Sequence, residues 1–417
     1  VPAHASATVA AGVPELAARA RAVLGRDLGR GRLGHVLDER DEGDGARSLA
    51  ADTGRLRETG NLLFHLSLLG VLLALATGSL YSYRGEALVV EGETFSNVLP
   101  AYDSVQPGAR FDAASLPPFT VRLDGLRVAF EERQLSELGA PRDFEAEVTT
   151  REAPGAAERE GSVAVNAPLE VAGTRLFLTG NGYAPDLEVR DGDGEVRWSG
   201  PVPFLPLDAT YTSEGVVKAP VPGGDDLALS GYLLPTAPAE PTEQLRSLFP
   251  DAREPRLVLT AWSGDIGLGD GTPQSVYELD SDRMTQLEDA DGAPLVLVLA
   301  PGDTVYLPGG GSVTFGDLPR FAAFQLRADP SGPLALVSAV LAVLGLVASL
   351  TLPRRRVWVR LVPADDAGGA EPARDEERGP RTVVQVAALS RGRDTGQQEH
   401  VDRVLASLVG PAEEESR

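Results

Sequence analysis

The 417-residue chain contains no cysteine. Structural disulfides, thiolate metal sites, cysteine nucleophiles and covalent haem attachment through C-x-x-C-H are therefore excluded within this chain. Lysine is almost absent as well, because Lys218 is the only one, and the formal net charge is −23. Such an acidic excess repels phosphates, so we do not expect nucleic acid as a partner.

Familiar catalytic motifs are also missing from the sequence. A phosphate-binding loop needs G-x-x-x-x-G-K-[ST], but Lys218 is followed by Ala219. No serine stands in a G-x-S-x-G elbow, and the four histidines form no H-E-x-x-H zinc motif. We therefore expect a protein that is noncatalytic by itself, with no catalytic residues and no metal site.

Two long apolar runs are present, NLLFHLSLLGVLLALATGSL at 61–80 and PLALVSAVLAVLGLVASLTL at 333–352. As a helix each would be about 30 Å long, which matches the hydrocarbon core of a bilayer, so we predict two transmembrane helices. Arg55 and Arg57 precede the first run and three arginines, 354–356, follow the second. This charge bias predicts that both ends of the chain are cytoplasmic and that the segment between the runs lies outside the plasma membrane.

The segment between the runs carries nearly all of the chain's net negative charge and has a β pattern. FTVRLDGLRVAF (119–130) alternates apolar and polar residues, while TRLFLTGNGYAP (174–185) and LEVRDGDGEVRW (187–198) combine strand-like runs with Asn-Gly and Asp-Gly turn signals. Many short strands with Gly/Pro turns predict a large all-β, antiparallel sandwich or barrel-like domain. Only PTEQLRSLFP (241–250) has a helical pattern here.

The two ends of the chain contain helix patterns at 13–25 and 396–410 and strand-like pieces at 31–38 and 381–389. We expect them to form one small α+β part, with a charged linker at 365–380. The predicted organisation is a cytoplasmic segment (1–60), a transmembrane helix (61–81), an extracytoplasmic β-rich domain (82–332), a transmembrane helix (333–353) and a cytoplasmic tail with a C-terminal helix (354–417).

Two stretches rich in glycine and aspartate do not match the patterns of calcium-binding or phosphate-binding loops. DGDGEV (191–196) begins like a calcium loop, but Val196 stands where glycine is needed and Val202 where glutamate is needed. We interpret it as a hairpin turn. No helix pattern follows GDIGLGDG (264–271) to bind a phosphate, so we interpret that stretch, with Asp265 and Asp270, as a loop.

His65 is the only titratable side chain inside either apolar run. A neutral imidazole is a common haem axial ligand. A histidine about one turn inside a helix end can also snorkel to the interface, or form a hydrogen bond with another helix, so these alternatives stay open. His4, His35 and His400 lie in polar or amphipathic stretches, and we expect them to be surface or partly buried residues.

Both apolar runs carry small residues at helical spacing, which favour close helix packing in a larger bundle. The first run has Gly70, Ala74 and Gly78, and the second has Ser338, Ala342, Gly345 and Ser349. At about 100° per residue, His65 lies about 140° from Gly70 and about 180° from Ala74. The imidazole is therefore predicted to point away from the packing face of its helix.

Four segments, in this order, resemble the ResB family of bacterial System II cytochrome c biogenesis, of actinobacterial type. They are RETGNLLFHLSLLGVLLALATG (57–78), VNAPLEVAGTRLFLTGNGYAP (165–185), GDIGLGDGTPQSVYELD (264–280), and DPSGPLALVSAVLAVLG (329–345) with PRRRVWVR (353–360). Members of the family typically have further transmembrane helices before the one that carries the histidine. Since the chain starts at Val1, we expect it to be a piece that lacks these N-terminal helices.

The resemblance implies a subunit of a haem lyase or cytochrome c synthase complex. Its expected partners are a ResC/CcsA-type membrane protein, apocytochrome c, ResA/CcdA-type thiol-reducing proteins and membrane lipid. The complex would export haem and present it with apocytochrome c for attachment. The membrane histidine of the family falls on His65, so the resemblance implies that His65 is an axial ligand of transiently bound haem b. The alternative is a membrane-tethered β-domain scaffold or sensing protein with no haem role.

Overall fold

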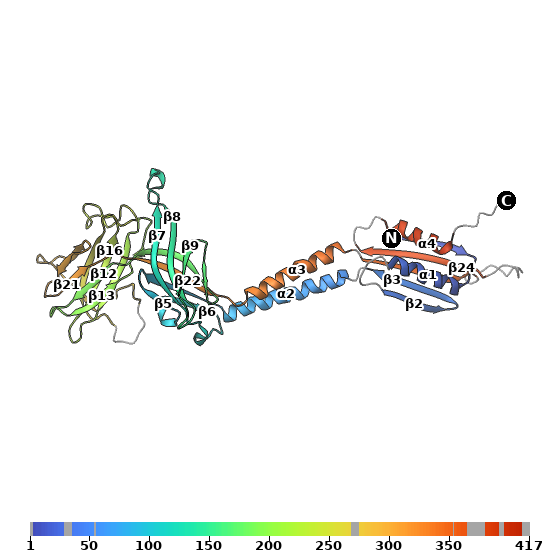
Figure 1. The fold of residues 1–417 in the computed structure, drawn as a ribbon, viewed down its shortest axis with the longest axis horizontal. Helices are drawn as coiled ribbons and strands as arrows, with labels where there is room; N and C mark the ends of the chain where they lie inside the picture. Colours follow the sequence, from blue (N-terminus) through green and yellow to red (C-terminus); the bar gives the residue numbers. More distant parts are fainter. Residues whose placement is uncertain are drawn as a thin grey trace. The chain divides into compact units, whose positions relative to one another are not determined.

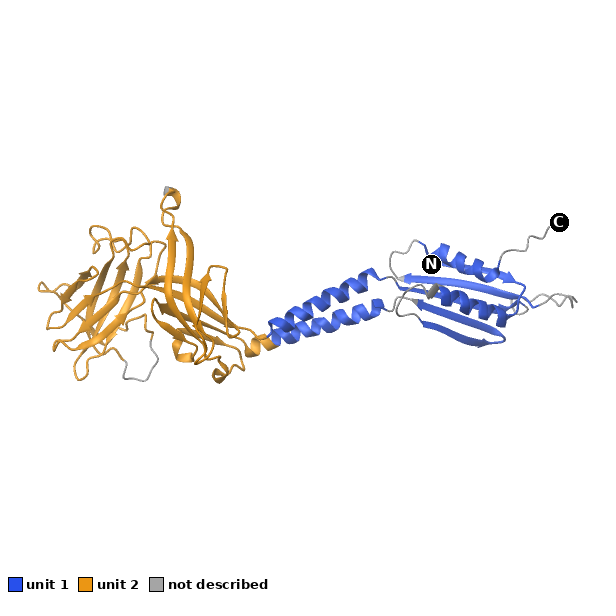
Figure 2. Cartoon of the chain, viewed as in Figure 1, with its two compact units in different colours: residues 1–76, 331–417 blue, residues 77–330 orange. Residues whose placement is uncertain are grey.

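The computed structural model describes residues 3–28, 36–53, 56–267, 275–352, 354–364, 380–391 and 396–410. Two compact units are found, one formed by residues 1–76 with 331–417 and the other by residues 77–330 (Figure 2). The described residues form mostly antiparallel sheets with four α-helices, which confirms that part of the predicted fold class. His35, Asp270 and almost all of the predicted linker lie outside the described residues.

Strands from both ends of the chain form the five-stranded antiparallel sheet of the first unit (Figure 1). Their spatial order is β1 (Ala3–Val9), β24 (Thr382–Arg391), β23 (Arg354–Pro363), β3 (Ala46–Thr53) and β2 (Val36–Gly43). The sequence patterns did not predict β1, β3 or β23. β23 begins with three arginines, which indicated the end of a membrane span rather than the start of a strand.

Helices α1 (Val13–Leu28) and α4 (Gln397–Val409) pack on one face of this sheet. Leu16 and Leu24 of α1 are fully buried, and Leu408 of α4 is buried on the face that the sequence predicted. Because side chains alternate along a strand, every second residue of the two central strands enters the same core. These residues are Val357, Val359, Leu361, Val384, Val386 and Ala388.

Helices α2 (Leu56–Tyr81) and α3 (Gly332–Thr351) are long and apolar enough to cross a membrane. They contain 26 and 20 residues, which gives lengths of about 39 and 30 Å at about 1.5 Å per residue. In α2 a polar first turn precedes the apolar run, so the helix starts earlier than the run itself.

The second unit contains two pairs of sheets, and each pair shares a hydrophobic core. In the first pair one sheet has the order β10 (Leu169–Val171), β11 (Thr174–Tyr183), β22 (Arg320–Ala328), β4 (Tyr83–Val90) and β6 (Ser104–Pro107). Its partner has the order β5 (Thr94–Ser96), β7 (Thr120–Phe130), β8 (Pro141–Arg151) and β9 (Arg159–Ala164). Leu123 and Phe324, from the two sheets, lie in their common core.

The second pair is built in the same way. One sheet has the order β13 (Val196–Pro201), β12 (Asp186–Arg190), β21 (Ser312–Phe315) and β20 (Thr304–Tyr306). The other has the order β14 (Leu205–Pro206), β15 (Ser213–Ala219), β16 (Asp226–Leu234), β17 (Arg256–Gly264) and β18 (Met284–Gln286), and β19 (Val296–Leu299) also pairs with β17. Short 3-10 turns occur at Leu99–Ala101, Ala113–Ser115 and Leu135–Glu137.

The turn predicted at Asn181-Gly182 is wrong. Strand β11 continues through both residues and stays paired with β22 as far as Tyr183. A Cβ atom at Gly182 would lie 2.6 Å from the ring of Phe321. The glycine therefore makes room for a neighbouring aromatic ring, and this packing overrides the local turn signal.

The Asp-Gly signal at 191–194, by contrast, does mark a turn, between β12 and β13. The carboxylate of Asp191 accepts hydrogen bonds from the backbone N–H groups of Asp193 and Glu195, each at 3.0 Å. In this way the side chain closes the turn on itself, as aspartate commonly does in hairpins. The hairpin interpretation of DGDGEV is confirmed.

The helix predicted at 241–250 does not form, and the segment consists of turns and bends. The backbone N–H of Ser247 donates to Oγ1 of Thr212 at 2.9 Å, and that of Leu248 donates to the carbonyl of Thr236 at 2.8 Å. A helix needs these amides for bonds to the fourth preceding residue. Tertiary partners have taken them instead, so the local helix pattern is overridden.

Candidate functional site

Helices α2 and α3 contact each other through small residues. The buried positions are Gly60, Ser67 and Ala74 on α2 and Ser338, Ala342 and Gly345 on α3. The stripe predicted on the second apolar run thus faces the first run, and three of its four residues are buried. In a lipid environment, small residues at an interface allow two helix backbones to approach closely.

The backbones of the two helices come close together at Gly60 and Gly345. A Cβ atom on Gly345 would lie 2.6 Å from the backbone nitrogen of Phe64 and 2.7 Å from the carbonyl oxygen of Gly60. Nearer the other end, a Cβ atom on Gly70 would lie 2.5 Å from Oγ of Ser338. The helices therefore leave no room between them for a planar cofactor, and any ligand of the pair must bind on its outer surface.

His65 lies on this outer surface, and its side chain is exposed. The angular prediction that it points away from the packing face agrees with this position. Its ring lies edge-on to that of Phe64, with 5.2 Å between the ring centroids. Around it the outer face of α2 is formed by exposed leucines, namely Leu62, Leu66, Leu68, Leu69, Leu72 and Leu73.

This arrangement gives a single imidazole on an apolar, leucine-lined surface. A ring nitrogen can supply one axial ligand to a haem iron, and the leucines can contact an apolar macrocycle. Within the apolar runs of α2 and α3, at 61–80 and 333–352, His65 is the only residue of a type that ligates haem iron. The residues present would thus fit one axial position of a haem, and a second axial ligand would have to come from outside this helix pair.

An ion-pair cluster lies where the helix pair meets the sheet of the first unit. Arg354, the first residue of β23, donates to Oδ2 of Asp52 at 2.8 Å and also pairs with Glu58 in the first turn of α2. The hydrogen bond to Asp52 raises the pKa of the Arg354 guanidinium above its usual value. The sequence used this arginine only to predict orientation, whereas the structure gives it the further role of fastening β23 to the base of α2.

The other residues considered from sequence lie on other elements of the fold than His65. His4 is exposed and His400 is partly buried, both in the α+β part of the first unit. In the second unit Asp265 follows β17 and pairs with Arg283, with 2.9 Å between the charged atoms. His4, His400 and Asp265 are thus not brought together with His65 in the units that contain them.

The comparisons with known proteins give one result. A family model described as the ResB-like family matches residues 1–402, which is nearly the whole chain. No curated protein matches the chain.

Proposed function

The chain belongs to the ResB-like family, which is linked to cytochrome c biogenesis, and we propose that it is a noncatalytic subunit that helps to export haem and to present it with apocytochrome c. Haem b is the cargo in this proposal and is bound only in transit. The absence of cysteine supports a noncatalytic role, because all thiol chemistry of attachment must then come from other proteins.

His65 carries the proposal. An ionisable side chain inside an apolar helix is costly when it faces lipid, and it usually faces protein, a cofactor or water. Here the imidazole is exposed and surrounded by leucines, and the small residues of α2 are already used for contact with α3. A further membrane protein that covers this face would shield the imidazole and could supply the second axial ligand. A ResC/CcsA-type protein is the partner that the family suggests.

The proposed orientation places both ends of the chain in the cytoplasm and residues 82–332 outside the plasma membrane. It is supported by Arg57 before the apolar run of α2 and by the three arginines at the start of β23. The β-rich second unit would then be on the side where apocytochrome c receives haem. ResA/CcdA-type proteins would keep the thiols of apocytochrome c reduced there.

The test is to coexpress the full chain with its ResC/CcsA-type partner, purify the complex in detergent and record the visible haem spectrum. We expect the wild type to carry haem and His65→Ala to lose it or to shift its spectrum. In His65→Met a thioether replaces the imidazole, so retained haem with a different axial-ligand spectrum is expected. The matched control is Leu75→Ala, an exposed leucine of the same helix ten residues from His65, which should leave the spectrum unchanged.

A merely structural role for His65 predicts a different result. In that case all four proteins would carry equal haem with identical spectra, or Leu75→Ala would lose as much haem as His65→Ala. Either outcome would contradict the ligand role. It would favour the alternative of a membrane-tethered scaffold or sensing protein.

A further inference from the structure

The sheet of the first unit has one face that the described helices do not cover. Helices α1 and α4 pack on the side of Val357 and Val359, so Arg356, Trp358 and Arg360 project from the opposite side of β23. Arg356 is opposite Leu389 of β24 in the strand register. Leu389 is 48% exposed, which is unusual for a large apolar side chain in a central strand.

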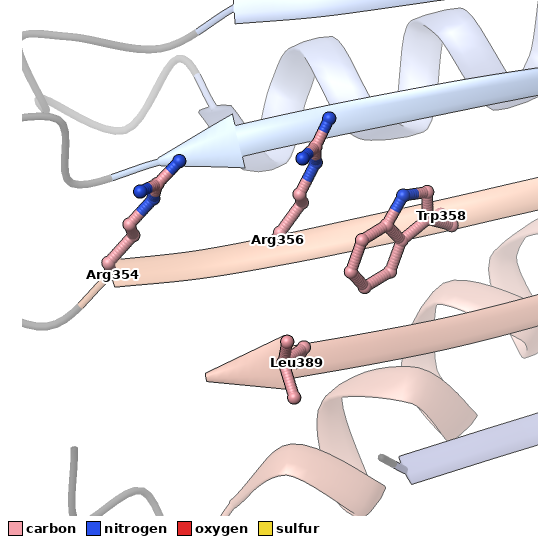
Figure 3. Close-up of a pocket in the computed structure, with 4 residues that line it drawn as sticks. All are labelled: Arg354, Arg356, Trp358 and Leu389. Atoms are coloured by element: carbon pink, nitrogen blue, oxygen red, sulfur yellow. The ribbon is translucent and has the colours of Figure 1, made fainter. Parts of the chain in front are cut away.

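A hollow of about 210 Å³ lies on this face, lined by Arg354, Arg356, Trp358 and Leu389 (Figure 3). The guanidinium carbon of Arg356 lies 5.4 Å from the centroid of the Trp358 ring, within the range of a cation–π contact. The hollow therefore combines a fixed cation, an indole and an exposed aliphatic side chain.

Charge is unevenly distributed around the hollow. Arg354 is neutralised by Asp52 and Glu58. Arg356 forms no ion pair with any residue in the described ranges, although Asp52 is its neighbour in the strand register. Further along the same strand Arg360 pairs with Glu42 at 2.7 Å. Among the arginines of β23 on this open face, Arg356 is thus the one that is available to an outside anion.

The hollow lies next to the membrane end of the helix pair. Arg354 contacts Glu58, which precedes the apolar run of α2 by one helical turn, about 6 Å at about 1.5 Å per residue. Arg356 follows the end of the apolar run of α3 by four residues, so it lies about 13 Å at most beyond it. The headgroup layer extends about 5–8 Å beyond the hydrocarbon core. Electrostatic attraction acts over a further Debye length of about 8 Å, so Arg356 is close enough to attract the headgroup phosphates.

We propose that this hollow binds the phosphate of an anionic phospholipid headgroup, in the leaflet next to the first unit. The planar guanidinium of Arg356 suits a phosphate, which it can bind through two parallel hydrogen bonds. Trp358 holds the guanidinium in place and is an aromatic of the kind enriched near membrane surfaces. Leu389 provides the apolar contact for the glycerol end of the lipid. The inference needs α2 and α3 to cross a membrane, but it does not depend on haem.

The test uses the full chain purified in detergent. Native mass spectrometry measures the dissociation constant of the first added phosphatidylglycerol and, separately, of phosphatidylcholine. We expect phosphatidylglycerol to bind more tightly, and Arg356→Gln to weaken it about fivefold, the effect of one basic residue near an anionic surface. Arg360→Gln is the matched control, because it removes an arginine from the same face of the same strand, and it should change the constant less than twofold.

A fluorescence measurement adds the position of the lipid. A phosphatidylglycerol that carries a quencher at its headgroup should quench the wild type more than Trp358→Phe, since Trp198 and Trp262 lie in the other unit. The proposal is overturned if both lipids bind alike, or if the two arginine variants weaken binding equally. It is also overturned if inorganic phosphate at millimolar concentration displaces the lipid, because the hollow would then be a site for free oxyanions.

Discussion

Replacing Gly345 by alanine tests how closely the two apolar helices approach. The new Cβ atom would lie 2.6 Å from the backbone nitrogen of Phe64 and 2.7 Å from the carbonyl oxygen of Gly60. Favourable contacts between heavy atoms are about 3.5–4.0 Å, so the backbones must separate locally by about 1 Å. No side-chain rotation can relieve the overlap, because both obstructing atoms belong to the backbone.

Overpacking of this kind typically costs about 1–3 kcal/mol. The chain has no cysteine, so Gly70→Cys with Ser338→Cys introduces the only two thiols. A Cβ atom at position 70 would lie 3.2 Å from that of Ser338, close to the Cβ separation of about 3.5–4.5 Å in a disulfide. The rate of disulfide formation in detergent therefore reports how often the helices are closely packed.

We expect Gly345→Ala to slow this oxidation about fivefold or more, the factor that corresponds to 1 kcal/mol or above. The matched control is Gly332→Ala in the same helix, where a Cβ atom meets nothing within 4 Å, and its oxidation rate should equal that of the parent. Equal rates for Gly345→Ala and Gly332→Ala would refute the close contact at Gly60 and Gly345.

Two further predictions concern the second unit. Gly182→Ala should destabilise the full chain by about 1–3 kcal/mol and lower its unfolding midpoint, because the new Cβ atom would lie 2.6 Å from the Phe321 ring. The control is Gly180→Ala, where the atom nearest to the new Cβ is 3.5 Å away. Equal unfolding midpoints for the two variants would contradict this reasoning. For Asp191, burial opposes the charge, but hydrogen bonds from Arg197 and two backbone amides lower the carboxyl pKa overall. Its stabilisation is therefore present above the unfolded pKa of about 3.9 and is lost as pH falls through the lower folded value. The urea stability difference between wild type and Asp191→Asn should shrink as the pH falls below about 4, and a difference that grows over that fall would contradict the assignment.

The helices were predictable from sequence because their signals are long and periodic. The apolar runs within α2 and α3 are evident directly, and α4 shows the face of Val401, Val404 and Leu408 that is buried in the structure. Strands with clear alternation, such as β7, were also predictable. In each case the local pattern and the tertiary environment favour the same structure.

Elsewhere the tertiary environment decides against the local pattern. Asn181-Gly182 is a strong hairpin signal, yet the ring of Phe321 needs the space that the glycine leaves in a strand. In segment 241–250 the amides of Ser247 and Leu248 bond to distant residues. β1 has short, weakly apolar side chains and becomes a strand because β24 pairs with it. None of these partners can be identified from the sequence on either side.

The candidate site was predictable only in part, for a related reason. Helical geometry placed His65 on the face opposite the small-residue ladder, and the side chain is exposed there. The hollow at Arg356 and Trp358 could not be predicted, because it requires β23 to be a strand with one face covered by α1 and α4. An arginine that follows an apolar run is interpreted from sequence as a marker of membrane orientation. That interpretation gives no indication that the same arginine also lines a pocket.

The division of faces on α2 supports the proposal that this chain works with a membrane partner. One face is committed to α3, since Gly60, Ser67 and Ala74 are buried against it. The opposite face keeps a titratable imidazole among leucines, and in lipid this arrangement is costly without a partner that shields the ring. In the proposed function a haem iron with two axial ligands would take one from His65 of this helix pair and the other from the partner. The exposed imidazole of His65 leaves the outer face of α2 in need of cover in lipid. In the proposed function, the same imidazole would let the helix pair share haem with a second membrane protein.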